Sequence, residues 1–203
     1  LGNDYPFKAS WGDYDNDGWT DLYVSKSLLF GGLVLRNDGE TGGVHNGFSN
    51  LFFLNDPSPT ATGGIWGDYN NDGFLDMFCS GQNPGEWSLW RNSFGSFANP
   101  SVGLIFDESP WPTRANGVAS CWVDFDNDGD LDIYTGGFEV DLATPLNDYW
   151  LTNNGNGNPF TETAQPSTGH SRGITACDYD EDGDMDIYVS VYRQLPNILW
   201  QND

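Results

Sequence analysis

Residues 13–21 read Asp-Tyr-Asp-Asn-Asp-Gly-Trp-Thr-Asp, and the apolar run Leu22-Tyr23-Val24 follows at once. Side-chain oxygens at positions 1, 3, 5 and 9 of this stretch, with the backbone carbonyl of position 7, can converge on one hard cation. The glycine at position 6 permits the sharp turn that such a loop needs. Without a metal ion, four carboxylates within nine residues would repel one another. The stretch therefore predicts a calcium-binding loop.

The same pattern recurs, so that loops begin at Asp13, Asp68, Asp124 and Asp178. The expected ligands at positions 1, 3, 5, 7 and 9 are Asp13, Asp15, Asp17, Trp19 and Asp21; Asp68, Asn70, Asp72, Phe74 and Asp76; Asp124, Asp126, Asp128, Asp130 and Asp132; and Asp178, Asp180, Asp182, Asp184 and Asp186. We expect about four Ca²⁺ ions per chain, because closely spaced protein oxygens suit calcium better than magnesium. Asn70 gives the second loop one negative charge fewer, which predicts the weakest calcium binding there.

The four loop starts are spaced by 55, 56 and 54 residues, which is the signature of a repeat architecture. A second marker keeps the same period: Arg36-Asn37, Arg91-Asn92 and Gln201-Asn202 each begin 23 residues after the first Asp of their loop. Thr152-Asn153 begins 28 residues after Asp124, which predicts an insertion of five residues within 139–147. The approximate repeats are 1–47, 48–105, 106–159 and 160–203, within one repeat region that spans 1–203.

Each repeat divides into short apolar segments separated by turn residues, and none shows a helical period over three turns, so the chain is predicted to be all-β. Segments that leave the loops, such as Met77-Phe78-Cys79, are apolar on consecutive residues, which indicates cover on both faces. Four-stranded sheets stacked around an axis, a β-propeller of blades of about 55 residues, give that cover. A parallel β-helix has a far shorter repeat, and a tandem array of independent calcium domains would leave each repeat with a marginal core.

Two sets of aromatic residues keep the register of the loops. Trp11, Trp66 and Trp122 lie two residues before a loop, and Tyr23, Phe78, Tyr134 and Tyr188 lie ten residues after a first Asp. A ligand-binding cage is one interpretation of these rows. Packing between blades is the favoured one, because register with a structural repeat is typical of core positions.

The run Trp-Gly-Asp-Tyr-Asp-Asn-Asp-Gly at 11–18, with Asp-Leu-Tyr-Val-Ser after it, resembles the FG-GAP/VCBS repeat of integrin-α-type propellers. It is also similar to acidic secreted proteins related to cartilage acidic protein and to bacterial ASPIC/UnbV-containing proteins. The resemblance implies a propeller of seven blades with Ca²⁺ in the loops, used for adhesion, glycan binding or scaffolding. Only four repeats are present, and the fourth stops at Asp203. We therefore expect part of a longer protein; an unusually small ring, or an arc completed by further copies as an oligomer or a filament, are the alternatives.

The composition narrows the classes of partner. The chain has 7 Lys and Arg against 30 Asp and Glu, and four Ca²⁺ ions would still leave a formal net charge of −15 in place of −23. Such an acidic surface argues against binding nucleic acid or an anionic membrane. The apolar stretch around Leu28–Leu35 is too short for membrane insertion, and the three cysteines fit no disulfide framework. Many calcium loops suit the high calcium outside cells, so we expect a secreted or cell-surface location.

No catalytic residues are predicted. The two histidines, His45 and His170, lie in Gly- and Ser-rich segments, and the sequence contains no nucleophile elbow, zinc-protease motif or phosphate-binding glycine loop. We expect a non-catalytic, calcium-binding structural or adhesive scaffold whose partner is a protein or its own copies. The alternative is a lectin-like propeller, in which Trp87, Trp111 or Trp150, outside the aromatic register, would stack on sugars.

Overall fold

The computed structural model describes residues 6–26, 32–53, 61–81, 87–92, 104–107, 117–137, 147–155, 160–165, 170–192 and 195–203. Every regular element within these ranges is a β-strand, which confirms the all-β prediction. The strands are β1 (Pro6–Gly12), β2 (Asp21–Lys26), β3 (Gly32–Asn37), β4 (Glu40–Thr41), β5 (Val44–His45), β6 (Phe48–Phe53), β7 (Ala61–Gly67), β8 (Asp76–Gly81), β9 (Ser88–Asn92), β10 (Leu104–Asp107), β11 (Gly117–Val123), β12 (Asp132–Gly137), β13 (Asp148–Thr152), β14 (Thr161–Gln165), β15 (His170–Cys177), β16 (Asp186–Tyr192) and β17 (Ile198–Trp200).

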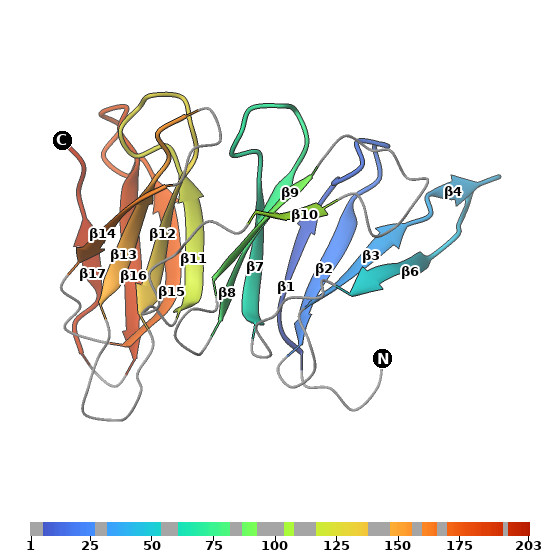
Figure 1. Cartoon of the computed structure of the whole chain (residues 1–203), viewed down its shortest axis with the longest axis horizontal. Coiled ribbons are helices and arrows are strands. Elements are labelled where there is room, and N and C mark those ends of the chain that lie inside the picture. The colour runs from blue at the N-terminus through green and yellow to red at the C-terminus, as the bar shows by residue number, and fades with distance from the viewer. Residues whose placement is uncertain are drawn as a thin grey trace.

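The strands form four antiparallel sheets that follow the order of the chain (Figure 1). The strand orders are β1-β2-β3-β6, β7-β8-β9-β10, β11-β12-β13-β14 and β15-β16-β17, and β4 and β5 form a separate hairpin. The sheets are displaced from the sequence repeats, because β6, β10 and β14, which begin at or near the start of a predicted repeat, each pair with the sheet before them. Residues 139–146 of the predicted insertion lie outside the described part of the chain.

In the second and third sheets, the second strand is covered on both faces. All six residues of β8 and all six of β12 are buried. This burial explains why their apolar residues are consecutive rather than alternating, since both faces of the strand contact another sheet. Strand β16 has the same pattern at its start but becomes exposed along its length, because the fourth sheet has a described neighbour on one side only.

The hydrophobic core lies between consecutive sheets. Tyr14, Tyr23 and Val34 of the first sheet form one buried cluster with Met77 and Cys79 of the second. Two further clusters repeat this arrangement between the second and third sheets and between the third and fourth. Burial of large apolar side chains at three such junctions is the main favourable contribution to this fold.

The tryptophan in register before a loop packs back on the preceding sheet. Trp66 stacks on Tyr14 with ring centroids 6.1 Å apart, and Trp122 stacks on Tyr69 at 6.5 Å. Gly67 lies beneath Trp122, and an added Cβ would come within 2.7 Å of the indole. Packing between sheets is therefore the correct interpretation for Trp66 and Trp122, whereas Trp11 of the first sheet is 61% exposed.

Two of the three tryptophans assigned to the glycan alternative are not available at the surface. Trp87 and Trp150 are 5% and 8% exposed and belong to clusters between sheets, so the prediction of exposed side chains there was wrong. Trp150 lies in strand β13 and Trp87 directly before β9, where both side chains pack in the core. Trp111 lies outside the described residues. Where the chain is described, it has no helix of the length and hydropathy needed to cross a membrane.

Candidate metal sites

The four predicted calcium loops have the same backbone conformation. Each connects the first two strands of its sheet, as between β1 and β2. The residue at position 4 has a positive φ in every loop, from 55° at Asn16 to 64° at Glu181. The glycine at position 6 also has a positive φ, between 88° at Gly18 and 103° at Gly183. Two left-handed residues so close together reverse the chain sharply, and glycine tolerates this conformation at little cost.

The aspartates at positions 1 and 5 bind backbone N–H groups of their own loop. In the first loop the N–H groups of Asp17 and Gly18 donate to the two oxygens of Asp13, at 3.1 and 2.9 Å. Asp17 in turn accepts the N–H of Trp19 at 2.9 Å. The equivalent bonds from position 7 to position 5 recur at Phe74, Asp130 and Asp184. These local bonds set the orientation of the side chains whose remaining lone pairs face the centre of the loop.

Three loops bring acidic side chains together closely enough to share a cation. One oxygen from each member lies within 4.8 Å of the others in the groups Asp13, Asp15 and Asp17; Asp124, Asp126 and Asp132; Asp178, Asp180 and Asp186; and Asp180, Asp182 and Asp203. The position-3 residue belongs to a group in each of these loops, and in the second loop this position is Asn70. Asp203 was not predicted as part of a site, because it lies outside the repeating pattern.

The aspartate at position 9 is the most buried member of every loop. Asp21 and Asp76 are 0% exposed, and Asp132 and Asp186 are 1% exposed. Its two oxygens accept backbone N–H groups, in the first loop from Tyr14 at 3.2 Å and from Asn37 at 2.8 Å. The same pair of bonds is present in the other three loops. This residue therefore fastens the loop to the third strand of its sheet, besides any role as a ligand.

Three of the position-9 carboxylates have a raised pKa. Burial raises the pKa of Asp21 to about 6, that of Asp76 to about 7 and that of Asp132 to about 6, and neighbouring carboxylates add to the effect. A raised pKa means that the folded chain favours the protonated form of these groups. A divalent cation at the centre of the loop would reverse this preference and keep the groups ionised.

One buried oxygen in the third loop identifies a position that a metal ion would fill. The Oδ1 atom of Asp124 is buried and makes no hydrogen bond, whereas Oδ2 accepts the N–H of Gly129 at 3.1 Å. Asp124 also belongs to the group with Asp126 and Asp132. A buried carboxylate oxygen needs a partner, and hard oxygen donors at this spacing match calcium. The residues present fit the ion that the sequence predicts.

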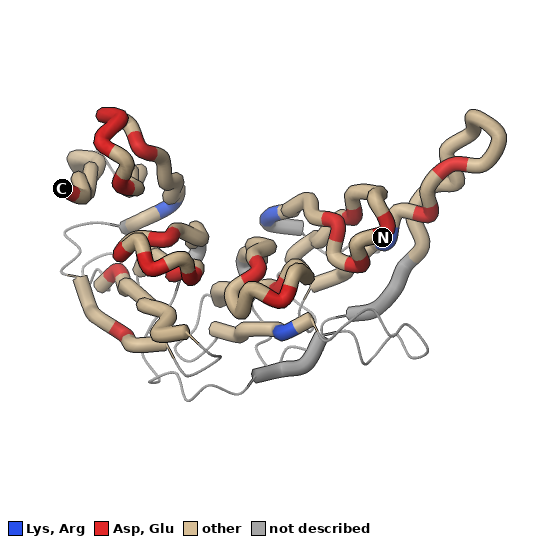
Figure 2. Tube along the Cα trace, turned by 90° about the horizontal axis from the view of Figure 1, so that it is seen from above, with Lys and Arg blue, Asp and Glu red and all other residues tan. Residues whose placement is uncertain are grey.

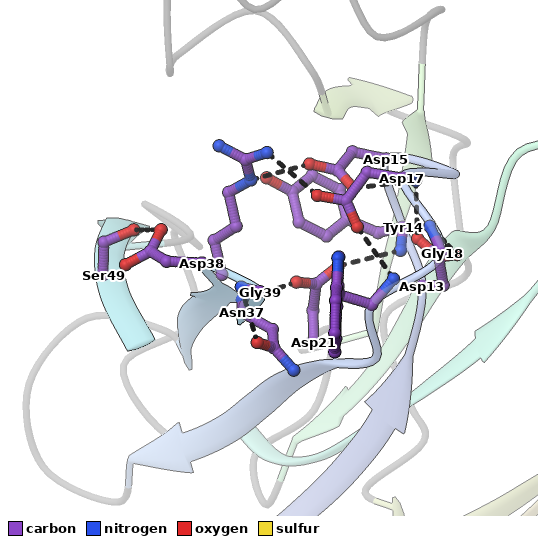
Figure 3. Close-up of polar contacts among 12 residues, drawn as sticks. Asp13, Tyr14, Asp15, Asp17, Gly18, Asp21, Asn37, Asp38, Gly39 and Ser49 are labelled. Atoms are coloured by element: carbon purple, nitrogen blue, oxygen red, sulfur yellow. Dashed lines mark hydrogen bonds and ion pairs between the residues drawn. The ribbon is translucent and has the colours of Figure 1, made fainter. Parts of the chain in front are cut away.

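In the first loop, a positively charged side chain from β3 contacts the acidic residues, and the sequence pattern did not reveal this contact. The Arg36 guanidinium on β3 contacts Oδ2 of Asp15 and Oδ2 of Asp17, each at 2.9 Å, where these two carboxylates point toward one another (Figure 3). In the fourth loop the equivalent residue, Gln201, donates to Asp180 at 2.9 Å. The regular spacing of the Arg-Asn marker was the available signal, but it does not tell which way the side chain points.

The asparagine of that marker links neighbouring sheets. The Nδ2 atom of Asn153 donates to the carbonyl of Tyr69 in the preceding sheet at 2.7 Å and to Leu131 in its own loop at 3.3 Å. Asn92 and Asn202 donate to the preceding sheet in the same way. Asn37, in the first sheet, donates to Thr20 in its own loop at 3.1 Å. The marker is thus a structural cross-link rather than a ligand.

The loops also contact one another directly. Asn16 donates to the carbonyl of Gly73 in the second loop at 2.8 Å, and Asn71 donates to Asp130 in the third at 2.6 Å. Asn127 reaches Asp184 in the fourth loop at 2.6 Å. Seen from above, the acidic residues of the successive loops lie near one another along one side of the molecule (Figure 2). Four candidate metal sites therefore form one continuous row.

Residues 68–135 and 140–189 match the model of the FG-GAP-like repeat family. These segments cover more than half of the chain and contain the second, third and fourth loops. The chain belongs to the FG-GAP-like repeat family. A search of curated proteins found no match. The expected likeness to cartilage acidic protein and to ASPIC/UnbV-containing proteins is not confirmed. The first loop lies outside the matched segments, yet it has the backbone conformation of the other three.

Proposed function

We propose that this FG-GAP repeat chain is a calcium-binding β-propeller region that serves as a non-catalytic scaffold for protein interactions outside the cell. Sheets that follow the chain order and meet face to face, through equivalent positions at each junction, are the arrangement expected of consecutive blades. Membership of the FG-GAP-like family supports the same architecture.

The observation that carries the calcium proposal is the unsatisfied Oδ1 atom of Asp124 within a group of three aspartates. Equivalent positions in the other loops have the same backbone conformation, so we propose one Ca²⁺ ion for each loop. The backbone carbonyls of Trp19, Phe74, Asp130 and Asp184 remain the proposed ligands at position 7. When bound, the ion supplies positive charge that neutralises the loop carboxylates and holds the turn between two strands.

A structural role for the ion fits the way the loops are built. The aspartates are tied to backbone N–H groups of the loop and of the third strand, so that closing the loop stabilises the junction between strands. His45, one of the two histidines, is 2.9 Å from Asn37, a residue of the repeat marker, and this contact does not resemble a catalytic pair. The proposal therefore assigns no catalytic residues. The glycan-binding alternative now rests on Trp111 alone among its named residues.

Isothermal titration of the calcium-free chain with Ca²⁺ and with Mg²⁺ tests the proposal. We expect about four calcium sites and a rise in the free energy of unfolding of about 2.7 kcal/mol for each site at a free Ca²⁺ concentration of 100 times its dissociation constant. Asp124→Asn should remove one site. Glu40→Gln, which changes an exposed acid on the β4–β5 hairpin, should remove none. Calcium binding that is absent, or that disappears equally in both variants, would contradict the proposal.

A further inference from the structure

A small cavity lies between the first three sheets. It is lined by residues of β1, β7 and β11, the first strands of these sheets, which follow one another across the molecule (Figure 1), and by residues of β8. Its volume is about 110 Å³. None of the described residues that line it belongs to a predicted calcium loop. The cavity is therefore a feature of the junctions between sheets and is separate from the candidate metal sites.

The wall of this cavity is basic and polar. Lys8 reaches it from β1, and three hydroxyl groups line it, from Ser10 on β1, Ser80 on β8 and Ser120 on β11. The other described lining residues are apolar or glycine, and none is acidic. In a chain with 30 Asp and Glu against 7 Lys and Arg, a wall with a lysine and without an acid is unusual. Such a wall favours an anion over a cation.

Two residues of the wall depart from the repeat. The position five residues before the first Asp of a loop holds a lysine in the first repeat and a small residue in the others, namely Lys8, Gly63, Ala119 and Gly173. The position three residues before that Asp holds Ser10 in the first repeat. Its counterparts Ile65 and Cys121 pack in the hydrophobic clusters of the next two junctions. Two departures at one place indicate a role that the repeat itself does not require.

The hydroxyl group of Ser10 needs a hydrogen-bond partner. Within the described part of the chain, its Oγ atom is buried and makes no hydrogen bond. Most buried polar atoms in native proteins are paired, because burying an unpaired hydroxyl costs free energy. The carbonyl of Ser10 accepts the indole Nε1 of Trp66 at 3.3 Å, which ties this residue to the second sheet. The Oγ atom is thus positioned to donate to a ligand in the cavity.

Lys8 is held at its backbone and along its side chain. Its N–H donates to Oγ of the fully buried Ser25 at 2.9 Å, and the same hydroxyl donates to the carbonyl of Lys8 at 3.1 Å. The side chain crosses to the second sheet. There Nζ of Lys8 and Oγ of Ser80 lie 3.8 and 3.7 Å from the place that a Cβ would take at Gly63. An ammonium group and a hydroxyl donor therefore flank the same glycine.

The electrostatic environment of Lys8 also favours an anion. Although this residue retains exposed surface, partial burial of its side chain lowers its pKa, and the positive charge of Arg172 on β15 lowers the pKa further. A lowered pKa means that the folded chain disfavours the ammonium form. An anion beside Lys8 would offset both effects, because it attracts the ammonium group and reduces the repulsion from Arg172.

We propose that this cavity binds a small oxyanion of the size of sulfate or phosphate, held by the Lys8 ammonium group and the hydroxyls of Ser10 and Ser80. Hydrogen bonds from ammonium and hydroxyl donors to an ionised acceptor are the stronger kind. A cavity of about 150 Å³ holds benzene. The smaller volume here suits a tetrahedral oxyanion, either as a free ion or as the charged end of an ester. This binding site goes beyond the scaffold function.

Isothermal titration with sodium sulfate tests the proposal, with calcium present and the ionic strength held constant by NaCl. We expect one sulfate for each chain. Lys8→Met should weaken sulfate binding by about tenfold or more, because it removes a charged hydrogen-bond donor. Arg91→Met removes the same charge from an exposed position on β9, outside the cavity. It should leave the sulfate affinity within about twofold, since distant exposed charges are screened.

A second variant separates a ligand-binding role from a structural one. Ser10→Ala removes a buried hydroxyl that makes no hydrogen bond within the described chain, so without sulfate the variant should unfold at the same temperature as the unmodified chain or at a higher one. Its sulfate affinity should fall by about three- to tenfold. In the unmodified chain, sulfate should raise the pKa of Lys8, which NMR of the side-chain signals measures. A hydroxyl that only supports the fold would give lower thermal stability and unchanged sulfate affinity.

Phenyl sulfate distinguishes the two sources of the oxyanion. Binding of phenyl sulfate as well as sulfate indicates that the site recognises the charged end of an ester, whereas binding of sulfate alone indicates a free ion. The proposal is overturned if neither compound binds, if Lys8→Met and Arg91→Met weaken binding equally, or if either Lys8→Met or Ser10→Ala leaves the affinity unchanged. Calcium titration of the same variants is a separate measurement, so a failure of the oxyanion site leaves the calcium proposal standing.

Discussion

The second and fourth sheets show which parts of this repeat are built locally and which depend on a neighbour. Their loops have nearly the same conformation, with φ of 88° at Gly73 and 103° at Gly183. The faces that they turn away from the preceding sheet differ, since Tyr69 is 3% exposed and Tyr179 is 48% exposed at the same position. The loop is made by hydrogen bonds within a few residues, whereas the core exists only where two sheets meet. Each repeat thus completes its candidate metal site but only half of its core.

The comparison predicts unequal effects of one substitution at two equivalent leucines. Leu89→Ala should lower the free energy of unfolding by roughly 2–5 kcal/mol, because the side chain is 2% exposed and its loss leaves a cavity between sheets. Leu199→Ala, at a 48% exposed position, should cost about 0.5 kcal/mol or less. Urea unfolding measures both. Equal losses of unfolding free energy would show that burial by a following sheet does not determine the cost of the substitution.

The loops and the strand class could be predicted from the sequence because their causes are local. Carboxylate spacing, the glycine at position 6 and consecutive apolar residues all act over a few residues, and they recur four times. The sequence also placed the inner members of the aromatic register, such as Trp66 and Trp122, between sheets. This worked because a period of about 55 residues brings equivalent positions of successive sheets together.

The missed features depend on contacts between distant residues. The contact of Arg36 with Asp15 and Asp17 joins residues 21 and 19 apart, and nothing in the spacing of charges shows it. The bond from Asn153 to Tyr69 joins residues 84 apart. Trp87 was misassigned for the same reason: its burial comes from the third sheet, where it meets Tyr149 with ring centroids 5.4 Å apart.

The asparagine cross-link gives a second, smaller test of inner against outer junctions. Asn153→Ala would leave the carbonyl of Tyr69 without its donor at a buried site, and we expect a loss of roughly 1–3 kcal/mol in the free energy of unfolding. Asn37→Ala loses no bond to a preceding sheet, so its cost should be lower, about 1 kcal/mol. Thermal unfolding of both variants with saturating calcium makes the comparison. A larger loss at Asn37 would contradict the cross-linking role.

The smallest expected effect tests whether each loop is electrostatically independent of the others. Arg36→Gln would give the first loop the residue that the fourth loop has in Gln201, and would remove a guanidinium from Asp15 and Asp17. Because the arginine side chain is 40% exposed, its contacts contribute only about 0.5–1 kcal/mol. Removing this positive charge should strengthen calcium binding at the first loop by about two- to fivefold.

A matched variant separates the local effect from the change in net charge. Arg172→Gln removes the same charge from β15, outside the loops, and should leave the calcium affinity of the first loop nearly unchanged. Asn70→Asp should strengthen the second loop, since it restores the carboxylate present at position 3 in the other three. Titration that resolves the individual sites, with Tb³⁺ luminescence excited through Trp19 as a probe of the first loop, would measure these shifts. If Arg172→Gln strengthens the first loop as much as Arg36→Gln does, net charge controls the affinity and the loops are not independent. A first loop that responds to Arg36 alone would show that each repeat sets its own affinity through one side chain on its third strand.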